Sequence, residues 1–186
     1  MGPLLLASNV FAHPDHSEHT HGVWDGVTHP LLGLDHLLAM VTVGLLAAQR
    51  GGRAVWAVPS AFVLSMIVGG IAGMCGVALP AVEFGIITSI VLLAGALASG
   101  RKDSLVEPLL FAAVFGVCHG HAHGTVMPLL ANPAWYAAGV VTSTIVLHVV
   151  GVVLGRFAIR FPKGATGLRL CGAVIACTGL VFMVIP

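Results

Sequence analysis

The amino-acid sequence predicts an all-α, polytopic membrane protein with about six transmembrane helices and both termini outside the cytoplasm. Three observations support this prediction: the composition, the length of the apolar runs and the distribution of the basic residues. Of the 186 residues, 58% are hydrophobic and only 8% are charged, whereas soluble domains carry about 25% charged residues. Because backbone exposed to lipid must form its hydrogen bonds within its own segment, the long apolar runs are expected to be helices.

Six apolar segments are each about 20 residues long, the length that a helix needs to cross about 30 Å of hydrocarbon. Short loops separate these segments, and they leave no room for a second folded domain. The expected spans are residues 27–48, 54–79, 82–99, 108–131, 133–157 and 166–185.

The basic residues lie on one side of this arrangement. All of them fall in or beside the loops after the first, third and fifth spans, and the loops after the second and fourth spans have none. Since cytoplasmic loops are enriched in Lys and Arg, this pattern places both termini outside. The eight residues are Arg50, Arg53, Arg101, Lys102, Arg156, Arg160, Lys163 and Arg169.

The N-terminal segment divides into two parts before the transmembrane domain of residues 27–186. Residues 1–12 resemble the end of a signal peptide, with a short apolar run before Val10-Phe11-Ala12. Residues 13–26 form a His-rich external tail without apolar periodicity, so the tail has little means of folding alone. Because imidazole binds transition metals, we expect the histidines of this tail, which begins at His13, to raise the local concentration of a metal ion; the alternative is a disordered polar leader.

The first span contains the stretch THPLLGLDHLLAM, residues 28–40, in which three ionisable residues interrupt an apolar run. Such residues are costly in hydrocarbon and usually functional. On a continuous helix, His29 and His36 would share one face about 10 Å apart, while Asp35 would point about 100° away from His36. The alternative is that His29 lies at the membrane interface and that Asp35 and His36 pair with polar groups of other helices.

The fourth span contains FGVCHGHAHGTVMP, residues 115–128. His119 and His123 are one helical turn apart, a spacing suited to one metal ion, although hydrogen bonds between helices are an alternative. His121 points nearly opposite and is a weaker candidate, which could instead make a structural bond. Small residues beside these histidines would let a neighbouring helix approach closely; they are Gly116, Gly120 and Gly124.

Depth in the membrane connects the two motifs. The first span enters from outside and the fourth span leaves toward the outside, so His36 and His119 are expected at one level, in one shared metal site. Neutral imidazole suits Zn, Cu, Fe and Ni. Two further residues are lower-ranked candidates: His148, as a ligand or a helix–helix hydrogen bond, and Glu83, as a carboxylate at the outer mouth or an ordinary interfacial acid.

Other classes of site find less support in the sequence. The four cysteines lie in apolar runs and form no CxxC pair, so neither a disulfide framework nor a zinc ribbon is indicated. No basic patch with interleaved aromatic residues is present, so nucleic acid is not an expected partner. The expected partners are the lipid bilayer and a divalent metal ion.

The two motifs together resemble those of a known family. HPLLGLDH, residues 29–36, has the H-x5-D-H pattern of the HupE/UreJ family of nickel/cobalt permeases, and CHGHAHG, residues 118–124, is similar to that family's FHGxAHGxE stretch. The resemblance covers essentially all the spans. Two positions depart from the pattern: Cys118 stands in place of Phe and Val126 in place of Glu, and Glu83 is a candidate replacement for that carboxylate.

The resemblance implies a permease of the bacterial inner membrane and not an enzyme. It implies uptake of Ni²⁺ or Co²⁺, with Zn²⁺ as a further candidate, and no permanently bound cofactor. The residues that it assigns to the metal path are His29, Asp35, His36, His119 and His123.

Two rival functions remain to be weighed. The first is a b-type haem electron-transfer protein, with axial ligands drawn from His36, His119 and His148. The second is an intramembrane metalloprotease, but the HExxH motif is absent and no Glu accompanies the histidines of the fourth span.

Overall fold

Seven α-helices make up the described part of the chain, residues 17–184 of a computed structural model, and no strand occurs in this part. The all-α prediction is confirmed. The expected signal-peptide segment, residues 1–12, and His13 lie outside the described residues. The helices are α1 (Ser17–Leu32), α2 (Leu34–Arg50), α3 (Ala54–Met74), α4 (Val82–Ser99), α5 (Val106–Thr125), α6 (Pro133–Ala158) and α7 (Gly164–Val184).

Helices α3, α4, α6 and α7 are each long and apolar enough to cross a membrane, and α1 with α2 forms a fifth candidate as one broken span. Helix α5 has 20 residues but is less apolar, because it carries three histidines and Glu107. The structure thus supports a multi-pass membrane protein, whereas six crossings stay a prediction.

The prediction of one continuous first span over residues 27–48 is wrong. Helix begins earlier, at Ser17, and so includes part of the predicted tail; it then breaks at Gly33, where α1 and α2 meet at an angle of 81°. Pro30 lies inside the last turn of α1. Proline cannot donate a backbone hydrogen bond and glycine is a poor helix former, so both residues weaken the helix at this point.

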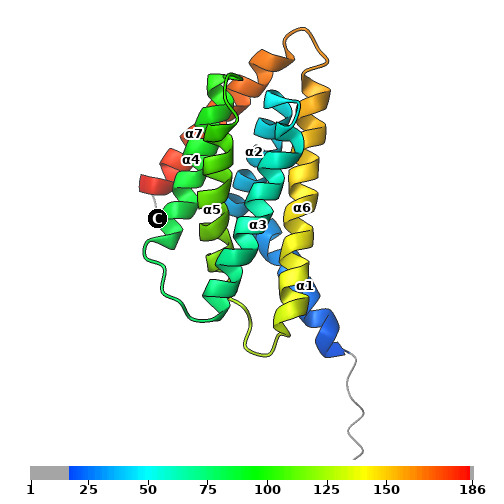
Figure 1. Cartoon of the computed structure of the whole chain (residues 1–186), viewed down its shortest axis with the longest axis vertical. Coiled ribbons are helices and arrows are strands. Elements are labelled where there is room, and N and C mark those ends of the chain that lie inside the picture. The colour runs from blue at the N-terminus through cyan, green and yellow to red at the C-terminus, as the bar shows by residue number, and fades with distance from the viewer. Residues whose placement is uncertain (1–16, 185–186) are drawn as a thin grey trace, which may run out of the picture.

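The helices run up and down, so that the loops gather at two ends of the molecule (Figure 1). The connections α2–α3, α4–α5 and α6–α7 lie at one end, drawn at the top, and all eight basic residues lie in or near these connections. We call this the basic end. There the guanidinium of Arg50 forms an ion pair with Glu107, at an Nη2–Oε2 distance of 3.0 Å, and links α2 to α5.

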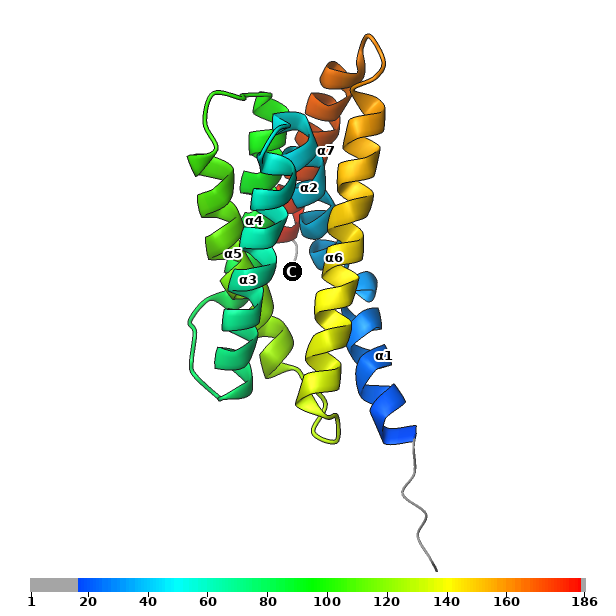
Figure 2. The ribbon, with the colours of Figure 1, turned by 45° about the vertical axis from the view of Figure 1, so that its right-hand side comes forward.

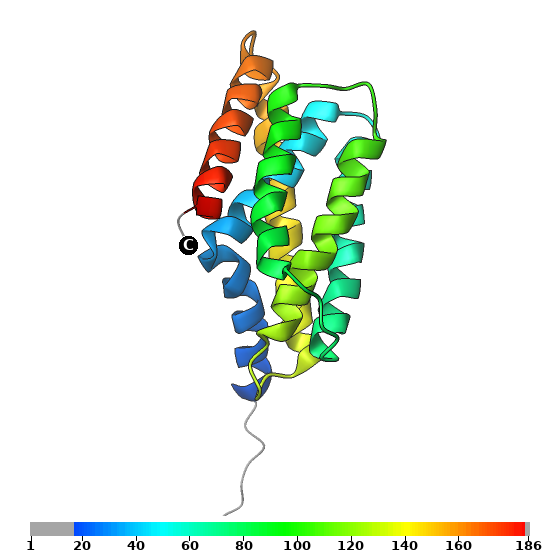
Figure 3. The same cartoon turned by 90° about the vertical axis from the view of Figure 1, so that its left-hand side faces the viewer.

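Neighbouring helices pack in pairs: α3 with α5, α2 with α6, and α4 with α7. Helix α1 lies along one half of α6, while α7 covers α4 on the other side of the molecule (Figures 2 and 3). The core is built mainly from apolar side chains of α2, α3, α4 and α6.

The glycine ridge on α5 packs against α3 and not against the first span. A Cβ added to Gly120 would collide with the carbonyl oxygen of Met66, and one added to Gly124 would collide with that of Gly70. The expected close approach of a neighbouring helix is therefore present. Its partner is α3, and α5 reaches the broken span through its histidine side chains instead.

Candidate metal centre

The break between α1 and α2 places a carboxylate at the start of a helix inside the molecule. Gly33 is the N-cap of α2 and provides no side chain for capping. The Oδ1 atom of Asp35 instead accepts a hydrogen bond from the backbone N–H of His36, at 2.8 Å. The positive end of the α2 dipole stabilises the Asp35 carboxylate at this position.

Four imidazole rings meet beside this break, and we call them the histidine cluster: His29, His36, His119 and His123. The ring centroid of His36 lies 6.1 Å from that of His29, 5.0 Å from that of His119 and 4.8 Å from that of His123. The centroids of His29 and His123 are 5.1 Å apart. The structure therefore brings together the side chains that the two motifs supply from α1, α2 and α5.

The bend changes two expected distances. The rings of His29 and His36 lie closer together than the straight helix predicts, because α1 and α2 meet at an angle. Asp35 does not point away from His36: its Oδ1 atom is 2.9 Å from Nδ1 of the His36 ring. His29 is exposed, whereas the other members of the cluster are buried.

Two hydrogen bonds assign the tautomers of the central rings. The carboxylate of Asp35 accepts from Nδ1–H of His36, which leaves Nε2 of His36 as the atom with a free lone pair. The hydroxyl of Ser89 donates to the carbonyl of Ile86, at 2.6 Å, so its oxygen accepts from Nε2–H of His119, at 3.0 Å. The free lone pair of His119 is then on Nδ1. Bonds of this kind are typical of histidines that bind metals.

The atoms left free are buried without hydrogen-bond partners. They are Nε2 of His36, Nδ1 of His119 and both ring nitrogens of His123. Burying a polar atom without a partner is unfavourable, and a cation held by the lone pairs of His36 and His119 and by the single lone pair of a neutral His123 ring would offset most of that cost. Within residues 17–184, however, no three His, Cys, Asp or Glu side chains lie close enough to hold one ion as they stand. Shared coordination therefore requires the rings to turn toward a common centre.

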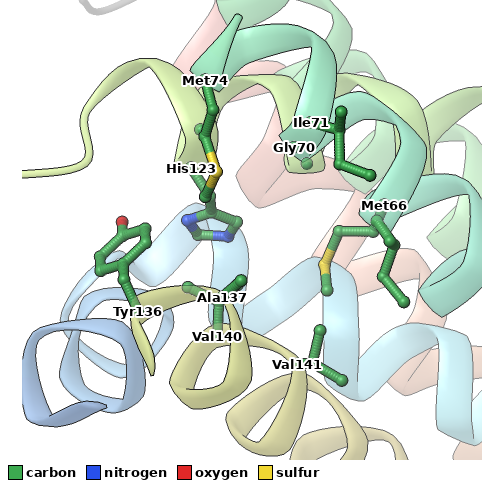
Figure 4. Close-up of a pocket in the computed structure, with 12 residues that line it drawn as sticks. Met66, Gly70, Ile71, Met74, His123, Tyr136, Ala137, Val140 and Val141 are labelled. Atoms are coloured by element: carbon green, nitrogen blue, oxygen red, sulfur yellow. The ribbon is translucent and has the colours of Figure 1, made fainter. Parts of the chain in front are cut away.

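The ring of His123 also reaches a cavity of about 70 Å³ between α3, α5 and α6. Figure 4 shows this imidazole between the side chains of Tyr136 and Met66, with Met74 beside it. The hydroxyl of Tyr136 is buried and has no hydrogen-bond partner. The cavity gives the His123 ring space in which to change its orientation.

The remaining candidates lie outside the cluster. His121 points away from it, as the helical spacing predicts, and its Nε2–H donates to the carbonyl of Val77 at 2.7 Å. Glu83 is exposed in the first turn of α4. Cys118 packs against Gly85 of α4: a Cβ added to Gly85 would lie 2.8 Å from the sulfur of Cys118. His148 is buried in α6, with its ring centroid 5.2 Å from that of Phe62.

Sequence reasoning missed two residues that contact His119. Ser89 hydrogen-bonds to this ring, and the centroid of the Phe62 ring lies 5.4 Å from the His119 centroid. Both lie in apolar runs that carry no motif. Only a contact in three dimensions distinguishes Ser89 from the other hydroxyl residues of the spans.

This fold and this site define the class: a multi-pass helical membrane protein with a cluster of histidines and one aspartate at the break between α1 and α2. The chain belongs to the HupE / UreJ family, whose model, described as HupE / UreJ protein, matches residues 2–182. Protein HupE of Rhizobium leguminosarum bv. viciae is 40% identical over 183 residues, covering 96% of this chain and 93% of that protein. No solved structure matches the chain.

Proposed function

We propose that this protein is a permease that takes up a divalent transition-metal cation, Ni²⁺ or Co²⁺, across the inner membrane of a bacterium. The cation would bind to the histidine cluster and to Asp35. The external tail, residues 13–26, would supply ions to this site. Zn²⁺ fits the same ligands and is the competing cargo. The protein would bind the cation in passing and would not act as an enzyme.

One observation carries this proposal: buried imidazoles with free lone pairs lie together beside a carboxylate at the break between α1 and α2. Discontinuous helices are common at the substrate sites of secondary transporters, because their ends offer unpaired polar groups inside the membrane. The negative charge of Asp35 would partly neutralise a divalent cation at low dielectric. Membership in the HupE / UreJ family supports the same class of function.

The haem alternative fits the arrangement less well. Axial ligation requires two imidazoles to face each other across a macrocycle. The rings of His36 and His119 instead pack edge to face against each other, with an interplanar angle of 85°. A Soret band in the purified protein would support the haem alternative against the permease.

Uptake of ⁶³Ni²⁺ or ⁵⁷Co²⁺ by cells that express single alanine variants tests the proposal. Replacing Asp35, His36, His119 or His123 is expected to lower the uptake rate by about tenfold or more, since each change removes a ligand or its charge. The matched control is His121→Ala, in the same motif, which is expected to have a milder effect because His121 points away from the cluster.

Each variant must be present in the membrane at the wild-type level, as measured by quantitative immunoblotting. Wild-type uptake no higher than that of cells without the protein would contradict the function. Undiminished uptake by the His36→Ala and His119→Ala variants would contradict the site.

A further inference from the structure

His148 is a buried histidine that the histidine cluster does not include. It lies in α6 and is 2% exposed. Neither ring nitrogen has a hydrogen-bond partner. The ring therefore differs from that of His121, which bonds to a carbonyl. Packing between helices therefore does not account for a histidine at this position, since an apolar side chain would fill the same space.

One aromatic ring contacts both His148 and the histidine cluster. Phe62 is fully buried, and its ring centroid is 5.4 Å from that of His119 and 5.2 Å from that of His148. His36, His119, Phe62 and His148 thus form a continuous line of rings. The Phe62 side chain contacts the imidazoles of both His119 and His148.

This line leads from the cluster toward the basic end. Helix α5 ends at Thr125, opposite the basic end. His119 lies six residues before Thr125, about 9 Å along the helix axis. His148 lies ten residues before the end of α6 at Ala158, about 15 Å from the basic end by the same rise. A cation that passed from His119 to His148 would move inward.

Further ligand atoms lie one helical turn from His148. Thr144 occupies the same face of α6, and its hydroxyl is 3.5 Å from the sulfur of Met66. His148 also lines a groove of about 580 Å³ between α3 and α6, whose lining is apolar except for His148, Ser60 and Arg156. An imidazole with a hydroxyl one turn away on its own helix, and no carboxylate, would be a weak site, as a site that must release its ion requires.

The geometry points to His148 as a second, inner cation-binding site, which receives the transported Ni²⁺ or Co²⁺ from the histidine cluster past Phe62. This inference rests on the proposed function. The outer cluster, with Asp35, binds the ion at equilibrium. The inner site holds it only during transfer.

Two variants of His148 test this assignment, each with two measurements: the rate of ⁶³Ni²⁺ uptake by cells, and equilibrium binding of ⁶³Ni²⁺ to the purified full-length protein in detergent. His148→Phe keeps an aromatic ring against Phe62 but removes the nitrogens, and His148→Gln keeps a polar side chain in case the first variant fails to fold. Val146→Phe, on the exposed face of α6, is the matched control for the added ring.

We expect both His148 variants to lose about tenfold or more of the uptake rate while their binding affinity stays within about twofold of wild type. His36→Ala is expected to lose uptake and binding together, and the control to retain both. Wild-type uptake rates in both His148 variants would overturn the inner site. Equal losses of binding and uptake would also overturn it, because His148 would then support only the cluster. Failure of the proposed function is distinct, since the wild-type protein would show no uptake.

Discussion

At the scale of single residues, two acceptors decide which imidazole nitrogens are available. Asp35 holds Nδ1–H of His36 and Ser89 holds Nε2–H of His119, so the free lone pairs are on opposite kinds of nitrogen in the two rings. A buried polar atom without a partner costs about 1–3 kcal/mol. The protein tolerates several such atoms in one place, which is the pattern expected of a binding site whose ligand supplies the missing interactions.

Ser89 is the residue whose role separates orientation from direct binding. Ser89→Ala removes the acceptor for Nε2–H of His119, so the ring can turn and its tautomer is no longer fixed. The affinity for Ni²⁺ is expected to fall about tenfold without being abolished, as for other residues that orient a metal ligand. Equilibrium binding to the purified variant measures this change.

Ser99→Ala is the control for this variant. The hydroxyl of Ser99 also donates to the carbonyl three residues earlier in α4, at 2.7 Å from Ala96 O, but it lies at the basic end, away from the cluster. Affinity should be unchanged in Ser99→Ala and restored in Ser89→Thr. An unchanged affinity in Ser89→Ala would mean that the Ser89 bond does not orient His119.

At the scale of helices, the sequence identifies the spans far better than it identifies their breaks and partners. The boundaries of α4 and α6 agree closely with the expected residues 82–99 and 133–157, because apolar length alone determines them. The break at Gly33 was missed although HPLLGLDH contains both Pro30 and Gly33, since the long apolar run outweighed these local signals. The small-residue ridge on α5 was recognised correctly, but a periodic ridge does not specify which helix packs against it.

The candidate site follows the same division. The two motifs supplied all five members of the expected site, because ionisable residues are conspicuous in apolar spans. The contact between Asp35 and His36 required the 81° bend, and the contact between His119 and Phe62 required the packing of α3 on α5. Neither contact has a signal in the linear sequence.

Gly33→Ala tests whether the break shapes the site. The backbone of Gly33, at φ −83° and ψ 109°, is accessible to alanine. A Cβ there would nevertheless lie 2.9 Å from Oδ1 of Asp35 and 3.1 Å from Nδ1 of His36, so this pair must shift. Alanine also favours helix by about 1 kcal/mol over glycine. We expect about a tenfold loss of Ni²⁺ affinity in equilibrium dialysis.

Gly95→Ala is the matched control for Gly33→Ala. Gly95 lies within α4, and an added Cβ would meet no atom within 4 Å. The control should bind Ni²⁺ as the wild-type protein does. If Gly33→Ala bound Ni²⁺ with wild-type affinity, the contact between Asp35 and His36 would not depend on the shape of this break.

At the scale of the whole molecule, the grouping of the basic residues at one end requires the polar helix α5 to cross from that end to the other. The α4–α5 connection lies at the basic end and the α5–α6 connection lies at the opposite end, so α5 runs the full length of the molecule (Figure 1). Helix α5 is less apolar than α3, α4, α6 and α7, since it carries His119, His121 and His123. All three side chains are buried in the protein, which is how polar groups are accommodated at membrane depth. The ion pair of Arg50 with Glu107 anchors its other end.

The last prediction concerns the membrane topology. If α5 crosses the membrane and the basic end is cytoplasmic, reporter fusions at Lys102 and Asn132 must lie on opposite sides. An alkaline phosphatase fusion, active only outside the cytoplasm, should be inactive at Lys102 and active at Asn132, and a green fluorescent protein fusion should give the reverse. A fusion at Lys163 is the internal control, since it lies at the same end as Lys102 and should match it. Equal results at Lys102 and Asn132 would show that α5 does not cross, and a consistent reversal at all three positions would invert the direction in which the cation path runs from the histidine cluster to His148.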